Sequence, residues 1–253
     1  MLLTTLAIAA ALQGAQGQDF RWSGRLADGK TLEIMGVNGE VRATAASGAT
    51  AEVTAAKSGR GDHEAVRIKV EETDEGVTIC AIYPNQVGDS CHDRGTRKNQ
   101  RRNDHDNNVE VDFEVRVPAG VRFVGRTVNG SVEATGLTAD AEVSTVNGDA
   151  SVSTRGWAEA TTVNGDVDAT VGRADWRGSA DFQTVNGTVT VTLPGSVDAD
   201  VEARTVNGEI ETDFPLTVTG RFGPRRLNGR IGSGGRTLSL ETVNGAIRIR
   251  RAS

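Results

Sequence analysis

The tetrapeptide Thr162-Val163-Asn164-Gly165 decides the fold of this chain, because close copies of it recur along the sequence. Val-Asn-Gly or Leu-Asn-Gly occurs eight times, and Thr precedes six of the copies. From Asn129 onward, successive asparagines are 16 to 22 residues apart. Such a period is typical of proteins in which every repeat adds one structural unit. The eight asparagines are Asn38, Asn129, Asn147, Asn164, Asn186, Asn207, Asn228 and Asn244.

Asn-Gly is typical of two structures, a type I′ hairpin turn and a corner between stacked coils. The residue before Asn is always Val or Leu, whereas seven of the eight residues after Gly are polar. A two-residue hairpin would pair these positions across the ladder, apolar against polar. A corner lets Val and the apolar residue two places after Gly both point inward, which favours a β-solenoid. A bulged hairpin in a meander or sandwich is the alternative.

The repeats therefore predict an all-β, single-chain β-solenoid of short strands with Asn-Gly corners. We expect the asparagines to stack as an amide ladder, while Gly supplies a backbone that other residues rarely adopt. Segments such as Thr188 to Leu193 and Ala246 to Arg250 alternate with the period of two expected for strands. Aromatic residues make up only 4% of the chain, so the predicted core is narrow and filled by Val, Ala and Thr.

Three segments are expected along the chain: a signal peptide (1–17), an N-terminal β region with a disulfide loop (18–120) and the regular repeat array (121–253). We expect Arg250 and Arg251 to cap the last coil and to block edge pairing.

The first residues carry the pattern of an export signal. Leu2 to Leu12 is an apolar run of the length of a signal-peptide core, and Ala15-Gln16-Gly17 is a small-x-small cleavage motif. No Lys or Arg precedes the run. Cleavage would make Gln18 the mature N-terminus, and the mature chain has no apolar run long enough to cross a membrane. The prediction is an exported protein that is periplasmic, secreted or on the cell surface.

Cys80 and Cys91 are the two cysteines of the chain. In an exported protein an isolated pair indicates a disulfide. Two free, buried thiols are the alternative, because spacing alone does not bring the side chains together.

The formal net charge of −6 excludes a general nucleic-acid binder, which would be basic. We expect no cofactor, and the partner classes that fit are an envelope glycan or a surface protein.

The segment between the second cysteine and residue 109 is the best candidate for metal binding. Asp104 to Asn108 reads Asp-His-Asp-Asn-Asn and, with His92 and Asp93, offers oxygen and nitrogen ligands. It lacks the glycine and distal Glu of a calcium loop, so a solvated loop is favoured and no metal is predicted. A local basic run could touch an anionic polymer, although a solvated loop again fits better: Arg94, Arg97, Lys98, Arg101 and Arg102.

Enzyme chemistry has weak support in the sequence. Asp149, Asp166 and Glu209 could line one face as the carboxylates of a glycan-cleaving site, but Thr188 and Arg230 interrupt the row. The three histidines, His63, His92 and His105, lie outside the regular array, so no Ser-His-Asp set is expected. Trp22, Trp157 and Trp176 could stack on sugars, but packing of coil ends is favoured.

The repeats and three further stretches resemble a bacterial family of unknown function whose members are proposed adhesins with β-strand repeats. The stretches are Val77 to Pro84, Val115 to Val121 and Gly234 to Leu240. The resemblance covers nearly the whole mature chain. It implies an extracytoplasmic, β-solenoid-like protein and brings no catalytic residues.

The sequence thus predicts a non-catalytic envelope or cell-surface protein that acts as a scaffold or adhesin. Two alternatives are a carbohydrate-active β-helix enzyme and an accessory or sensing module of an envelope-stress system.

Overall fold

The computed structural model describes residues 20–84, 86–92, 95–96, 108–173, 176, 179–218 and 225–252. The predicted signal peptide lies outside these ranges, as does most of the Asp104 to Asn108 segment. The described residues form strands, and they include no helix that is long and apolar enough to cross a membrane.

The strands are β1 (Phe20–Arg25), β2 (Thr31–Met35), β3 (Val41–Ala45), β4 (Thr50–Arg60), β5 (Arg67–Thr73), β6 (Gly76–Ile82), β7 (Gln86–Val87), β8 (Gly95–Thr96), β9 (Asn108–Val117), β10 (Arg122–Arg126), β11 (Val132–Leu137), β12 (Ala141–Ser144), β13 (Ala150–Thr154), β14 (Ala158–Thr161), β15 (Val167–Val171), β16 (Ser179–Gln183), β17 (Val189–Leu193), β18 (Ala199–Arg204), β19 (Ile210–Thr212), β20 (Thr217–Val218), β21 (Arg226–Ile231), β22 (Arg236–Glu241) and β23 (Ile247–Arg251).

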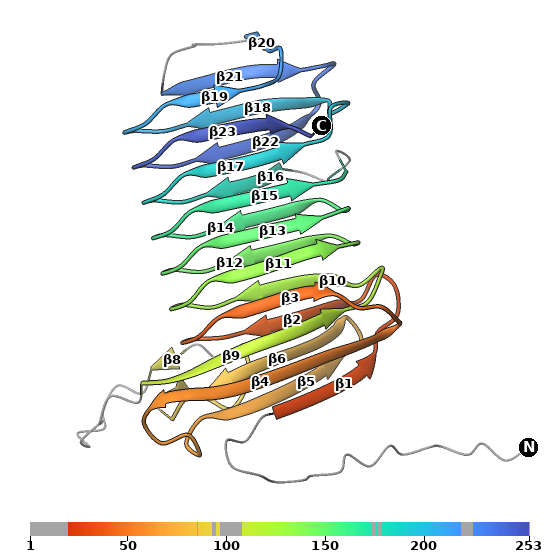
Figure 1. Cartoon of the computed structure of the whole chain (residues 1–253), viewed down its shortest axis with the longest axis vertical. Helices are drawn as coiled ribbons and strands as arrows, with labels where there is room; N and C mark the ends of the chain where they lie inside the picture. Colours follow the sequence, from red (N-terminus) through yellow and green to blue (C-terminus); the bar gives the residue numbers. More distant parts are fainter. Residues whose placement is uncertain are drawn as a thin grey trace, which may run out of the picture.

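Two long sheets face each other along the whole molecule (Figure 1). Sheet A has the order β1-β4-β9-β3-β11-β13-β15-β17-β23-β19. Sheet B has the order β20-β21-β18-β22-β16-β14-β12-β10-β2-β6-β5. β7 and β8 pair only with each other. The predicted all-β solenoid is confirmed.

Each regular coil gives one strand to each sheet. β12 and β13 form one such coil, and the corner at Asn147 joins them. Neighbouring coils pair in parallel with equivalent residues in register, as Val132 with Ala150 and Ala150 with Val167. Because a slip of one residue would turn every inward side chain outward, the apolar alternation holds the coils in this register.

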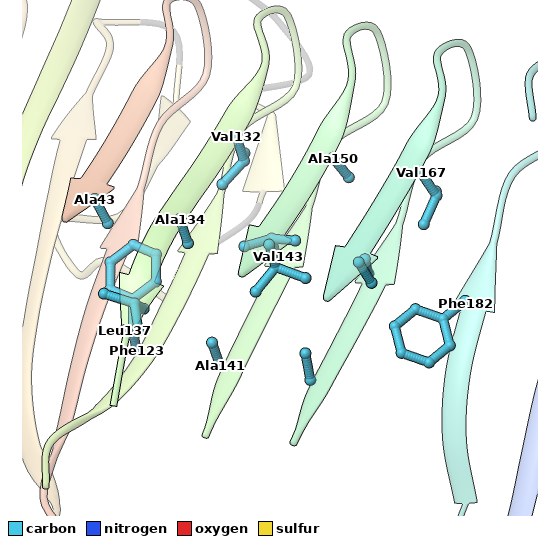
Figure 2. Close-up of a cluster of buried hydrophobic side chains, with 14 of the residues drawn as sticks. Ala43, Phe123, Val132, Ala134, Leu137, Ala141, Val143, Ala150, Val167 and Phe182 are labelled. Carbon is cyan, nitrogen blue, oxygen red and sulfur yellow. The ribbon is translucent and has the colours of Figure 1, made fainter. Parts of the chain in front are cut away.

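The core is a narrow layer of small apolar side chains between the sheets (Figure 2). Val132, Ala150 and Val167 succeed one another along sheet A and are fully buried. Phe123 of β10 and Phe182 of β16 are also buried and belong to sheet B. Stacking lets each methyl group contact its equivalent in the next coil, which removes apolar surface from water without bulky residues.

The N-terminal end of the stack is built by antiparallel strands. β4 pairs antiparallel with both β9 and β1 in sheet A, and β5 pairs antiparallel with β6 in sheet B. Above them β2 and β3 form the first coil, which β10 and β11 continue in parallel.

The last coil of the chain lies inside the stack instead of at its end. This C-terminal coil (residues 236–251) places β22 between β16 and β18, and β23 between β17 and β19. The antiparallel strands β21 and β20 lie beyond it and close sheet B. The expectation that Arg250 and Arg251 cap the last coil is wrong, because β23 has a strand on either side.

Candidate functional site

The threonine of each corner points into the molecule. Its hydroxyl donates to the carbonyl of the corner glycine in the adjacent coil, at 2.7 to 3.1 Å. These side chains are only 3–6% exposed. The bond satisfies the hydroxyl where an unpaired one would be costly. The donors are Thr127, Thr145, Thr162, Thr184, Thr205 and Thr242.

Seven of the eight asparagines form one file along the corner edge. Beyond Asn38, which only accepts, each Nδ2 donates to the Oδ1 of the asparagine in an adjacent coil at 2.7 to 2.8 Å. The amides lie at the surface, so the ladder is exposed. Its order is Asn38, Asn129, Asn147, Asn164, Asn186, Asn244 and Asn207, which repeats the insertion of the C-terminal coil.

The prediction that every one of the eight asparagines forms a corner is wrong for Asn228. This residue lies inside β21, where it pairs antiparallel with Glu202 of β18. Arg226 stands where six of the other copies have Thr, so no threonine hydroxyl is available there to bond a neighbouring coil. The Leu-Asn-Gly copy continues a strand.

The corner glycine is required by the closeness of the coils. At Gly148 φ is 145°, and a Cβ there would lie 2.3 Å from the carbonyl oxygen of Gly130. A side chain at this position would separate the two coils and break the adjacent ladder bonds.

Tyr83 closes the N-terminal end of the ladder. Its hydroxyl donates to the carbonyl of Val109 at 2.9 Å and lies 3.4 Å from the carbonyl of Asn38. Burial raises the pKa of Tyr83 to about 12. The phenol thus stays neutral and serves as a donor at the point where the regular corners begin.

At the six Thr-Val-Asn-Gly corners the valine points outward, which contradicts the expectation that it points into the core, whereas Val37 of the first corner packs against the core. Because Thr faces inward, the adjacent Val must face the other way. Among the described residues these valines are the large hydrophobic side chains that are exposed, at 38–47%. The valine row, in stacking order, is Val128, Val146, Val163, Val185, Val243 and Val206.

The carboxylates after the corners are bound to the backbone. Asp149 Oδ1 accepts the Asp166 N–H at 2.8 Å, and Asp166 Oδ1 accepts the Thr188 N–H at 2.7 Å. Asp168 lies in the next outward position, where burial and the charges of Asp166 and Asp149 raise its pKa. Glu209 is separated from this group because the C-terminal coil intervenes. The three carboxylates considered for a glycan-cleaving site therefore do not gather in one place.

A charged network covers the outer face of sheet B near the N-terminal end. Glu142 pairs with Arg126 at 2.6 Å and with Arg122 at 3.0 Å. Arg126 also reaches Glu33 at 3.4 Å, and Arg122 lies over the ring of Trp157 at 5.9 Å. In the adjacent strand, burial raises the pKa of Glu159, with further contributions from Glu142 and Asp181.

Cys80 and Cys91 are joined, with their Cα atoms 5.6 Å apart. The bond holds residues 88–92, the disulfide clip, against the outer face of sheet B, where Cys80 and Cys91 pack with Met35 and Ile82. The Cys91 N–H donates to Glu71 at 3.2 Å. Burial pushes the pKa of Glu71 upward, but hydrogen bonds from Lys69, Cys91 and Ser90 outweigh it and hold the pKa below its usual value.

The metal candidates are divided between described and undescribed residues. Asp93 and residues 104–107, with the basic run at 94–102, lie outside the described residues, apart from the backbone of β8. Asn108 begins β9. His92 lies on the clip, with Nε2 3.5 Å from Glu33 and Nδ1 3.8 Å from Glu71. Within the described ranges no three His, Cys, Asp or Glu side chains are grouped to hold a metal ion.

The three tryptophans pack against the molecule. Trp176 is 1% exposed and donates its indole N–H to the Thr237 carbonyl at 2.9 Å, so it offers no face to a sugar. Trp22 and Trp157 are half-buried against the core. Two open hollows are present: one of about 380 Å³ beside Arg67, Tyr83 and Asp89, and one of about 260 Å³ beside Phe214 and Arg251.

A family model and several solved structures are similar to this chain. The model of the family described as Toastrack DUF4097 matches residues 25–250. A proposed cell adhesion protein from Clostridium sporogenes shares 13% identity and a TM-score of 0.50, over 93% of this chain and all of that chain. A proposed adhesin from Bacteroides fragilis shares 12% identity and a TM-score of 0.37, over 93% and 97%. A search of curated proteins finds no match.

Proposed function

Since the chain belongs to the Toastrack DUF4097 family, we propose that it is an exported, non-catalytic protein of the cell envelope or cell surface that binds its partner along the corner edge. The valine row carries this proposal. Scattered apolar side chains are normal on a surface, whereas a continuous row points to a contact. With strands about 4.8 Å apart, six stacked valines span about 24 Å.

The surroundings of the valine row suit a protein or glycan partner. The exposed amides of the asparagine ladder run along one side. Because the ladder bonds fix the orientation of each amide, its remaining N–H and its oxygen can bind a partner in a defined direction. Along the other side the central coils carry Ser144, Thr161 and Gln183, which are polar and uncharged. In these central coils the apolar row lies between neutral polar residues, which allows close contact without desolvating a charge, whereas Arg126, Glu241 and Arg204 occupy the same position in the outer coils. The adhesion role proposed for the Clostridium sporogenes protein is compatible with such an edge.

The carbohydrate-active alternative has less support. Asp149 and Asp166 each use a carboxylate oxygen on a backbone N–H, and Glu209 lies two coils beyond Thr188. A glycosidase needs two carboxyl groups that face each other across a bond.

The test compares the wild-type chain with Val146→Thr/Val163→Thr/Val185→Thr on a glycan array and on bacterial surface fractions. Threonine keeps the branched shape and lowers the apolar area. Binding should fall about tenfold or more, since the central residues of an interface carry most of its energy. The matched control is Thr135→Ser/Thr170→Ser/Thr192→Ser on the outer face of sheet A, which should bind normally. Equal binding by the wild-type chain and the valine variant would exclude the corner edge as the partner-binding surface.

A reducing-sugar assay on the same glycans addresses the enzyme alternative. Polysaccharide turnover that disappears in Asp149→Asn or Asp166→Asn would refute a non-catalytic role.

A further inference from the structure

The two ends of the stack expose very different sheet edges (Figure 1). At the C-terminal end the edge strands are β19, with three residues, and β20, with two. At the N-terminal end sheet B ends on β5, which has seven residues. Short edges are protected against pairing with other chains, whereas long ones are templates for it.

β5 has the properties of an unfilled pairing edge. Its one partner among the described strands is β6. Ile68 and Val70 face inward opposite the buried Ala81 and Ile79, yet both remain partly exposed. A further strand beside β5 would cover them and satisfy the outward row of backbone groups.

The charges of β5 indicate which strand fits there. Lys69 and Glu71 face outward on either side of Val70, where they also contact residues 89–91 of the disulfide clip, and they are 36% and 22% exposed. In an antiparallel pair centred on Val70, Lys69 would lie opposite Glu71 of the other strand, and Glu71 opposite its Lys69. Directly opposed charges of unlike sign stabilise a strand pair. Lys69 and Glu71 are also 3.1 Å apart within the chain, so the four groups would alternate in sign.

We propose that the β5 edge is a self-association surface whose partner is a second copy of this chain, related by a two-fold axis through Val70. A strand that is complementary to itself favours a second copy over an unrelated chain, because one two-fold axis satisfies both charge pairs. The resulting pair of molecules meets by the N-terminal ends and continues sheet B through the junction. This inference concerns assembly and does not depend on the corner edge being the partner-binding surface.

The test uses the chain from residue 18 onward and two single charge reversals, Lys69→Glu and Glu71→Lys. Sedimentation velocity on wild type should show a concentration-dependent dimer. Each variant alone would place like charges opposite each other twice, so its dissociation constant should rise about tenfold. An equimolar mixture should dimerise like wild type, because the two strands of a mixed pair carry opposite charges at both facing positions.

The mixture separates assembly from folding, since mixing cannot repair a folding defect within one chain. Arg67→Glu is the matched control: it changes the charge of β5 as much as Lys69→Glu, but position 67 would face Thr73 and dimerisation should persist. A wild-type chain that stays monomeric at about 0.1 mM, or a mixture no better than its components, would overturn the proposal.

If a charge variant fails to fold, Val70→Cys tests the same two-fold interface. A two-fold axis through residue 70 brings the two new thiols together, so oxidation should yield a covalent dimer on a non-reducing gel. Absence of that dimer at concentrations where wild type associates would place the interface elsewhere and overturn the proposal.

Discussion

At the scale of single residues, each member of Thr-Val-Asn-Gly has a separate role. Thr162 bonds the adjacent coil from inside, and Val163 is exposed outside. Asn164 continues the ladder, and Gly165 lets the coils approach. The division explains why the tetrapeptide recurs as a unit, since a change at one position disturbs the geometry on which the other three depend.

The ladder bonds should make a measurable but moderate contribution to stability. Asn147→Ala removes two amide bonds, and because the amides are exposed the destabilisation should be about 1 kcal/mol, as for hydrogen bonds that compete with water. Asn207→Ala, at the end of the file where the amide makes one ladder bond, should cost about half as much. Urea unfolding of both variants measures this difference. Identical midpoints for wild type and Asn147→Ala would show that the ladder is energetically neutral.

Tyr83 should make the fold sensitive to alkaline pH. Its pKa is about 12 in the folded chain and near 10 in the unfolded one, so the folded state holds the proton more tightly. Stability from this group is complete below pH 10 and is lost as pH rises toward 12. Urea unfolding between about pH 9 and about pH 11, which brackets the onset, should show a steeper decline for wild type than for Tyr83→Phe. Parallel declines would mean that the phenol is not the group responsible.

The sequence alone predicts which residues form the corners better than it predicts whether their side chains point inward or outward. The period and the Asn-Gly pairs indicate stacked corners, and seven asparagines lie there. The inward valine is wrong because polarity suggests that Thr is the outward residue. Thr162 is inside because a glycine carbonyl of the next coil accepts its hydroxyl, and this acceptor is invisible until coils are stacked.

At the scale of elements, the inserted C-terminal coil connects two parts of the stack. Within the two sheets, β18 and β19 reach the earlier coils only through β22 and β23. Arg250 pairs with Asp213 at 3.1 Å and with Glu211 at 2.9 Å, which fixes the neighbouring coil to it. Sequence order cannot reveal this insertion, because the corners at Asn186, Asn207 and Asn244 carry the same residues and can stack in any order.

Deletion of residues 236–253 should therefore unfold more than the deleted coil. Hydrogen exchange should lose protection across 199–231, where β18 and β21 lose their connection to the stack, while 122–171 stays protected. A solenoid with its last coil at the end would lose only that coil. Retained protection in β18 and β21 would show that they can stack directly on β16 and β17.

At the scale of the whole molecule, the fold is a stack of similar coils with antiparallel strands at both ends. Stability in such a stack comes from each coil and its interfaces with its neighbours. The number of coils should thus be adjustable if register is kept.

Removal of one coil tests this directly. Deletion of residues 141–157 joins Asp140 to Ala158, which occupies the register position of Ala141. Glu159 then takes the place of Glu142 beside Arg122 and Arg126. We expect a β circular-dichroism spectrum and cooperative unfolding at a lower midpoint. Deletion of 141–156 shifts the strand by one residue and should abolish folding, because apolar side chains turn outward. Equal behaviour of the two deletions would contradict a register-based stack.

The position of the C-terminal coil also determines when folding of the stack can finish. Residues 236–251 are synthesised after the coils on either side of them, yet they fill the place between those two coils. The final shape is therefore reached only after these residues have been made and released from the ribosome. Until then the coils on either side lack their shared neighbour, so this end of the stack stays open during synthesis.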